Sequence, residues 1–277
     1  MFKVIGIGDN VVDKYIHIKT YFPGGNALNF AVYSKMFGIE AAYMGIFGND
    51  EPGDHIKSVL SEIGIDYSHS ITKDGENGFA RVNLVDGDRV FLKGNGGGVS
   101  SKYPLKLSNE DLDYIKNFDL IHSSCYSSME SEYYKIKELN KFFSFDFSDK
   151  ISDDYLKEIC PNITFGLLSC SHLSLVDTKE KLQKVLNFGS KYALASRGIE
   201  GALFFDGNKF FTQKAKLVEP VDTLGAGDSF VTAFLCNLVK NLYFYSEDLI
   251  NESLEGGAEF ASKTCMVMGA FGYGKKY

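Results

Sequence analysis

The sequence has few of the features that mark secreted, membrane-spanning or zinc-binding proteins. Its five cysteines include no C-x-x-C pair, and an odd, scattered set of thiols is typical of reduced cysteines in a cytoplasm. The five histidines show no metal-ligand spacing, which argues against a zinc site. No apolar run is long enough to span a bilayer, and the run before Asp9 is too short for a signal peptide. We therefore expect a cytoplasmic protein without a membrane partner.

Basic charge is also scarce, and this excludes another class of partner. The chain has 36 acidic and 29 basic residues, a net charge of −7 and no long run of one sign. A nucleic-acid or anionic-membrane partner would require a basic stripe or tail, so we expect neither. Only 5 prolines stand against 28 glycines, and the 44% hydrophobic content is that of a folded globular enzyme. A chain of 277 residues forms one large domain, or one domain with an appendage.

Short apolar strands alternate with helical stretches along most of the chain. The spacing predicts helices over 27–37, ended by Gly38, and over 50–63, closed by Gly64. The expected strands include "KVIGIG", "AAYMGIFG", "FDLIHSS", "FFSFDFS", "ITFGLLS" and "YALASRG", and "GALFFDGNKFFT" is expected to be a hairpin. This alternation favours a mainly parallel sheet with helices on both faces.

Two segments interrupt that alternation. "DKYIHIKTYF" alternates like one half-exposed strand, and "FARVNLVDGDRVFLKG" predicts an antiparallel hairpin that turns at Asp86-Gly87-Asp88. We expect residues 11–20 and 77–99 to form a small β lid on a single domain of residues 1–277. "KGNGGGVS", just past the hairpin, is typical of a lid hinge. Arg81 and Arg89 are interpreted as solvated lid residues, with contact to an anionic substrate group as the alternative.

The stretch "VDTLGAGDSF" has the composition of a phosphate-binding loop before a helix. Gly225, Ala226 and Gly227 allow backbone N–H groups to approach a ligand, and the helix dipole adds positive potential there. Asp228 would take a proton from an attacking hydroxyl, which is worth on the order of 10²–10⁴ in rate. Asp222 would either hold the turn through backbone N–H groups or bind water around magnesium. The alternative is that the two acids only cap a helix.

This stretch resembles the C-terminal signature of the ribokinase-like (PfkB) family of sugar kinases. "PGGNALNFAVYSKMFG", "GIFGNDEPGDHI" and "ASRGIEGALFFDG" resemble further family motifs, in the family's order and over nearly the whole chain. The resemblance implies a three-layer αβα sandwich with a mainly parallel sheet and a small β-sheet lid. It also implies ATP and Mg²⁺, with in-line phosphoryl transfer to a sugar hydroxyl. Asp228 would be the catalytic base, and the amides of Gly225, Ala226 and Gly227 the anion hole.

The same resemblance assigns the nucleotide site and raises a question about the metal. It implies that ATP contacts Ser196, Gly198, Gly201, Thr223, Gly225 and Gly227. The family usually carries an Asn-x-x-Glu segment whose glutamate organises magnesium-bound water. The corresponding "GLLSCSHLS" offers Ser169 and His172 instead. We therefore assign no direct protein ligand to magnesium.

Four further motifs narrow the substrate. "IGDNVVDKY", "GGNALNFAVY", "GDRVF" and "FDFSDK" are similar to the branch of the family that phosphorylates the 6-hydroxyl of fructoselysine, a glycated amino acid. The likeness implies that sugar hydroxyls are held by Asp13, Gly25, Asn26 and Asn29. Asp9 stands close enough in sequence to share that work, as does Asn10. Polar side chains suit a sugar because unpaired polar groups in a closed site are costly.

Several alternatives stay open at this stage. Asn26 and Asn29 would instead cap a helix, and Asp13 would be a solvated strand end. His122 and Tyr126, at a strand's carboxyl end, either face the substrate or belong to the core and surface. The kinase would act on fructose, ribose, a nucleoside or a deoxy-sugar acid, or the protein would be a non-catalytic sugar-binding regulator. A homodimer through the lid is typical of some relatives.

Overall fold

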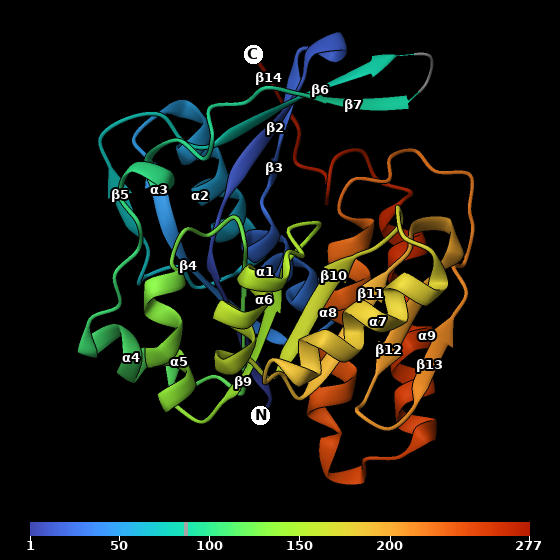
Figure 1. The fold of residues 1–277 in the computed structure, drawn as a ribbon. Coiled ribbons are helices and arrows are strands. Elements are labelled where there is room, and N and C mark those ends of the chain that lie inside the picture. The colour runs from blue at the N-terminus through green and yellow to red at the C-terminus, as the bar shows by residue number, and fades with distance from the viewer. Residues whose placement is uncertain (86–87) are drawn as a thin grey trace.

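A computed structural model describes residues 1–85 and 88–277 of the chain. Within those residues a sheet of nine strands is covered by helices on both faces, and a second sheet has five strands (Figure 1). The expected α/β sandwich with a mainly parallel sheet and a small second sheet is confirmed. No helix in the described ranges is both long enough and apolar enough to cross a membrane.

The large sheet is parallel except at one edge. Its strands, in spatial order, are β13 (Phe210–Gln213), β12 (Ala202–Phe205), β11 (Tyr192–Ser196), β10 (Phe165–Ser169), β9 (Phe142–Asp146), β8 (Leu120–Ser124), β1 (Lys3–Gly8), β4 (Glu40–Gly48) and β5 (Ile71–Lys73). Only β11–β12 and β12–β13 pair antiparallel, so the predicted "GALFFDGNKFFT" hairpin is confirmed. The carboxyl ends of the parallel strands therefore meet at one edge, where open α/β sheets bind ligands.

Two layers of helices enclose this sheet. One face carries α1 (Asn26–Met36), α2 (Glu51–Ile63), α8 (Ala226–Lys240) and α9 (Glu247–Thr264). The other face carries α4 (Asn109–Ile115), α5 (Tyr133–Glu138), α6 (Asp153–Ile159) and α7 (Leu175–Asn187), and α3 (Val99–Lys102) is a short turn beside β4. The helices predicted at 27–37 and 50–63 correspond to α1 and α2.

Local signals explain where α2 begins and ends. The Asp50 carboxylate accepts the Gly53 N–H at 3.0 Å and caps the first turn, which also contains Pro52. Gly64 ends the helix in the left-handed region, with φ of 77°.

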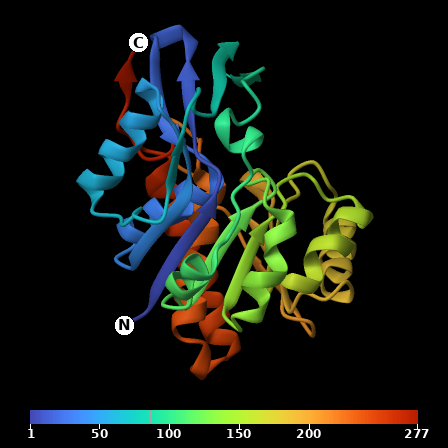
Figure 2. The same ribbon diagram turned by 90° about the vertical axis from the view of Figure 1, so that its left-hand side faces the viewer.

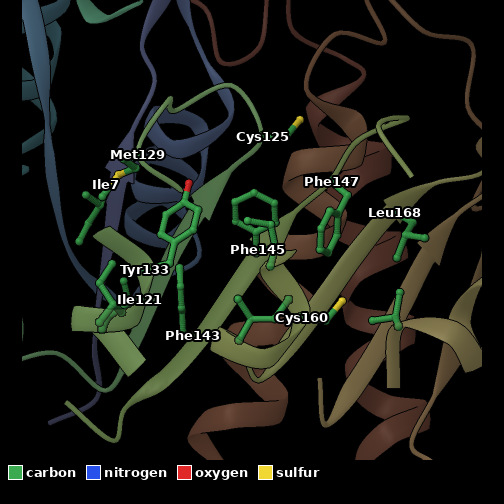
Figure 3. Close-up of a cluster of buried hydrophobic side chains, with 14 of the residues drawn as sticks. Ile7, Ile121, Cys125, Met129, Tyr133, Phe143, Phe145, Phe147, Cys160 and Leu168 are labelled. Carbon is green, nitrogen blue, oxygen red and sulfur yellow. The ribbon is translucent and has the colours of Figure 1, made fainter. Parts of the chain in front are cut away.

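The side chains of β9 point alternately into the hydrophobic core and toward the other face of the sheet. Phe143 and Phe145 point into the hydrophobic cluster under α5 and α6, where the Phe145 ring lies 5.2 Å from that of Tyr133 (Figure 3). Because successive strand side chains point to opposite faces, Ser144 and Asp146 face the α1 side of the sheet. The polar positions of "FFSFDF" therefore carry a carboxylate to the ligand-binding edge.

The second sheet stands beyond the carboxyl ends of the large sheet's strands (Figures 1 and 2). Its strand order is β14 (Lys275–Lys276), β3 (Thr20–Gly24), β2 (Val11–Tyr15), β6 (Phe79–Val85) and β7 (Asp88–Leu92). β2 and β6 are parallel, and the other pairs are antiparallel. The sheet thus also includes the rest of β3 after Thr20 and the C-terminal β14, which lie outside the expected lid segments.

The prediction of one continuous strand over "DKYIHIKTYF" is wrong. β2 ends at Tyr15, a 3₁₀ turn covers Ile16–Ile18, and Thr20 begins β3. Lys19 reverses the chain in the left-handed region with φ of 48°. The alternation continued through Ile16 and Ile18, but at the hairpin tip these side chains are 40% and 39% exposed. Alternating residue types do not reveal such a reversal because Lys carries no turn signal.

The second predicted hairpin is present as β6 and β7, which pair antiparallel. Its expected turn includes residues 86–87, which lie outside the described residues, as does the Arg89 side chain. Arg81 is exposed, with its guanidinium 5.4 Å from the Phe79 ring centroid, and this agrees with a solvated residue.

Candidate active site

The N-terminus of α8 is shaped by Gly225. This residue has φ of 75°, and an added Cβ would collide with the Tyr33 hydroxyl, so the loop requires glycine there. The Ala226 N–H donates to the Thr223 carbonyl at 3.3 Å. Within the described residues the amides of Gly225 and Gly227 donate no hydrogen bond to the protein. Two of the three amides predicted to form an anion hole are therefore available to a ligand at the positive end of the helix.

The carboxylate of Asp222 stabilises this loop through hydrogen bonds. It accepts the Leu224 N–H at 3.0 Å, the Gly269 N–H at 2.9 Å and the Tyr15 hydroxyl at 2.5 Å. The side chain is buried, with the residue 6% exposed. Of the two roles open to Asp222, the contacts match the one that holds the turn.

Asp228 lies in the first turn of α8 between two amides from α1. Asn29 Nδ2 donates to its Oδ2 at 2.6 Å, and Asn26 Nδ2 donates to its Oδ1 at 3.0 Å. Burial raises the pKa of Asp228 to about 7, and the nearby Asp146 carboxylate adds to the shift. Neither asparagine side chain caps α1, so that alternative is wrong.

Asp9 performs the capping instead. Its carboxylate accepts the backbone N–H groups of Asn26 at 2.6 Å and Ala27 at 3.3 Å. It also accepts the hydroxyls of Ser124 at 2.7 Å and Ser127 at 3.0 Å. Asp9 was predicted to bind substrate, but these four bonds use most of its acceptor capacity, and they indicate that it anchors α1.

Asp13 and Gly25 lie near this cluster but differ in what constrains them. Asp13 is buried on β2, with its carboxylate packed against Gly24. Gly25 precedes α1 with φ of 113°, and an added Cβ would lie 2.7 Å from the Asn10 Cα. Close approach of two chain segments therefore requires glycine at position 25.

Asp146 is a site residue that the sequence reasoning missed. It ends β9 with 8% exposure, and its Oδ2 accepts Asn26 Nδ2 at 2.9 Å. Its Oδ1 accepts the Ser148 N–H at 2.7 Å. Burial raises the pKa of Asp146 to about 6. The signal was present, because a carboxylate at the carboxyl end of a parallel strand lies where open sheets bind ligands.

The buried side chain of His122 contacts the side-chain amide of Asn26. Its Nε2 lies 2.8 Å from Asn26 Oδ1, its Nδ1 lies 2.9 Å from Ser144 Oγ, and its ring stacks 4.3 Å from Phe30. Burial lowers the pKa of His122 to about 3, so the ring is neutral. Because Asn26 Oδ1 can only accept, the Nε2–H of His122 must donate, which fixes the amide orientation. Tyr126, in contrast, is 48% exposed.

A cavity of about 550 Å³ lies at the N-terminus of α8, where Ala226 and Gly227 form part of its wall. It brings together five of the six residues predicted to bind nucleotide: Ser196, Gly198, Gly201, Thr223 and Gly227. In the described chain the sixth, Gly225, is not part of the lining. Apolar side chains, including Ile199, Leu217 and Val218, complete the wall and would suit a flat base.

The carboxylates of this region do not form a metal cage. In residues 1–85 and 88–277 no three His, Cys, Asp or Glu side chains gather closely enough to hold a metal ion. Ser169 lines the cavity, whereas His172 is exposed and is not among the lining residues of the described chain.

The sequence is similar to known kinases over almost its full length. Residues 4–270 match the model of the pfkB family of carbohydrate kinases. The chain is 40% identical to fructosamine kinase FrlD of Bacillus subtilis over 276 residues, which is 99% of this chain and 95% of that protein. It is 31% identical to fructoselysine 6-kinase of Escherichia coli, over 96% of this chain and 98% of that one.

Solved structures agree at the level of the fold. The ribokinase of Giardia lamblia superimposes with a TM-score of 0.84 and 17% identity, over 100% of this chain and 98% of that one. The Arabidopsis thaliana ribokinase complexed with ribose and ATP gives 0.82 and 22%, over 98% and 94%. With the family match spanning both the loop at α8 and the cluster around Asn26, the chain belongs to the pfkB family of carbohydrate kinases.

Proposed function

We propose that this kinase transfers the γ-phosphoryl group of ATP to the 6-hydroxyl of a fructosamine, with fructoselysine as the substrate. The observation that carries the proposal is that the amides of Asn26 and Asn29 hold Asp228, which directly follows Gly227 in the cavity wall. Two relatives that span nearly the whole chain are named for fructosamine and fructoselysine, which supports the substrate class.

The chemistry of the proposed step follows from the site. Asp228 accepts the proton of the 6-hydroxyl while the oxygen of that hydroxyl attacks the γ-phosphorus in line with the leaving ADP. A base with a pKa near the working pH is the most effective, and burial brings the pKa of Asp228 to about 7. The free amides of Gly225 and Gly227 stabilise charge on the transferring group, and one such donor is worth about 10²–10³ in rate.

The nucleotide site is proposed on the cavity at α8. Its size, its apolar wall and the glycine backbone at its end fit an adenine nucleotide with phosphates directed at Gly227. A solved relative with a TM-score of 0.79, a putative ribokinase II from E. coli, is described in complex with ATP and Mg²⁺. Because the described residues offer no metal cage, magnesium enters here as part of the MgATP substrate.

The sugar site is proposed on the opposite side of Asp228. Asn26, Asn29 and Asp13 would pair with hydroxyls, and Gly25 lets the sugar approach the backbone at the start of α1. The second sheet stands over this edge (Figure 2), and as a lid it would keep water from competing for the phosphoryl group. Its outer strands, β14 and β7, leave edges to which a second copy could add in a lid-mediated homodimer.

The experiment is ATP-dependent ADP release with fructoselysine, fructose, ribose and adenosine, on the wild type and on Asp228→Asn. We expect kcat/KM to be highest on fructoselysine and to fall by at least about 10² in the variant. A preference for another sugar, with the same fall, would retain the base and refute the substrate. Undiminished turnover by Asp228→Asn would refute the assignment of the base. Sugar binding without turnover of any substrate would favour a regulator.

A further inference from the structure

Three carboxylates, those of the buried Asp9 and Asp146 and of the half-buried Asp228, meet around Asn26 without a basic side chain to balance them. Asp146 and Asp228 accept hydrogen bonds from the side chain of Asn26, and Asp9 accepts one from its backbone N–H. In the described chain no Lys or Arg contributes to the pKa shift of Asp146 or Asp228. Lys150, which is close in sequence, donates instead to the Cys125 carbonyl at 3.0 Å. The pocket therefore brings acidic side chains together without a cation from the protein to balance their ionised forms.

A second observation points to a hydrogen-bond donor from outside the protein. Asn29 is 5% exposed, and its Oδ1 has no hydrogen-bond partner among the described residues. Its Nδ2 already donates to Asp228, so this buried oxygen lies beside the same cluster. Buried acceptors without partners are rare in native proteins, and a bound ligand with N–H or O–H groups would satisfy this one.

The three carboxylates differ in their remaining capacity. Asp9 is committed to four protein donors. Asp228 faces the reacting hydroxyl in the proposed chemistry. Asp146 accepts one protein donor on each oxygen, from Ser148 and Asn26, which leaves a lone pair on each. Asp146 is therefore the carboxylate that can receive a positively charged group.

We propose that Asp146 binds the secondary ammonium group that joins the sugar to the amino acid in a glycated amine. This rests on the proposed function, and it names the part of the substrate that the site selects. Asp146 Oδ2 and Asp228 Oδ1 lie 2.9 and 3.0 Å from the same Asn26 nitrogen. These two oxygens are therefore close enough to each other for one hexose to contact both carboxylates.

An ion pair between Asp146 and the substrate ammonium predicts selectivity for a glycated amine over neutral sugars. A cation against Asp146 supplies the charge that the pocket lacks, whereas a hydroxyl at C1 leaves two carboxylates in mutual repulsion. The ammonium also favours the ionised form of Asp228, because the positive charge offsets the field that raises its pKa. Binding of the correct substrate would therefore help ionise the base that acts on it.

The test pairs a protein change with a substrate change. The substrates are fructoselysine and a thioether isostere in which neutral sulfur replaces the ammonium nitrogen. The proteins are the wild type, Asp146→Asn and, as a matched control on the exposed surface, Asp149→Asn. We measure kcat/KM for each pair and the thermal midpoint of each protein.

We expect the wild type to lose on the order of 10² in kcat/KM on the isostere, because one partner of a buried charge pair is removed. Asp146→Asn should treat the two substrates within a few-fold of each other, and Asp149→Asn should behave as the wild type. Equal activity of the wild type on both substrates would overturn the ammonium site even if Asp146→Asn fails to fold. A tenfold or greater preference retained by folded Asp146→Asn would also overturn it. Absence of wild-type turnover on fructoselysine would instead refute the proposed function, and the ammonium site with it.

Discussion

Alanine at Gly225 and alanine at Gly227 should have opposite effects on stability, although the residues are two positions apart. At Gly225 the left-handed backbone costs alanine about 1–2 kcal/mol. The new Cβ also displaces the Tyr33 hydroxyl, which donates to the Ala270 carbonyl at 2.5 Å, and a lost hydrogen bond adds about 1–2 kcal/mol. Gly225→Ala should therefore lower the free energy of unfolding by about 2–4 kcal/mol.

Gly227 lies in the first turn of α8, and an added Cβ meets no atom within 4 Å. Alanine is the better helix former, so Gly227→Ala should raise the free energy of unfolding by about 0.5–1 kcal/mol. The same methyl group would stand in the cavity where the phosphoryl group approaches. We expect kcat/KM to fall on the order of 10², because the free amide can no longer reach its ligand.

Urea unfolding and ADP release on the two variants measure both quantities. Each variant serves as the control for the other, since both add one methyl group to the same loop. If Gly227→Ala keeps wild-type activity, the phosphoryl group does not approach this turn. If Gly225→Ala is as stable as the wild type, its backbone conformation is not the constraint that we describe.

Three further predictions concern the groups behind the loop. The kcat/KM should rise with pH through about 7, because only ionised Asp228 accepts a proton. Asp146→Asn should move this rise to lower pH, because it removes a negative charge near Asp228. A pH–rate profile that this variant leaves unchanged would contradict the coupling between the two carboxylates. His122→Phe should lower kcat by at least about tenfold, whereas His122→Gln, which keeps an N–H for the same amide oxygen, should restore most of it; equal losses would argue against the positioning role. Tyr15→Phe should lower kcat/KM by about tenfold, because Asp222 loses one of its donors; an unchanged rate would show that the two backbone donors suffice.

Much of the fold could be predicted because its signals are local. Gly64 and Asp50 mark the ends of α2, and the alternation of apolar strands with helices indicates the parallel sheet. The failed prediction at "DKYIHIKTYF" has a local cause as well. Lys19 adopts a left-handed turn that its residue type does not favour, since neighbouring strands of the second sheet determine where the chain reverses.

Part of the candidate site could be predicted from the sequence, and part could not. The loop from Asp222 to Asp228 could be recognised because its glycines, its acids and the following helix are contiguous. Asp146 could not be ranked above other acidic residues, because its role depends on Asn26, 120 positions away. Nothing near Asp9 in the sequence shows that its carboxylate accepts the backbone N–H groups of Asn26 and Ala27, 17 and 18 positions away.

The sequence by itself determined the family, most of the alternation of strands and helices, and the glycine loop with its proposed base, because these depend on residues close together in the chain. The tertiary structure alone decided which polar side chains form hydrogen bonds within the protein and which remain available to a ligand. Hydrogen bonds between residues 17 to 120 positions apart commit Asp9 to the start of α1, orient Asn26 through His122 and leave Asp146 with unused acceptor capacity. Such pairings form only when the sheet brings the carboxyl ends of its strands to one edge, so sequence spacing carries no trace of them.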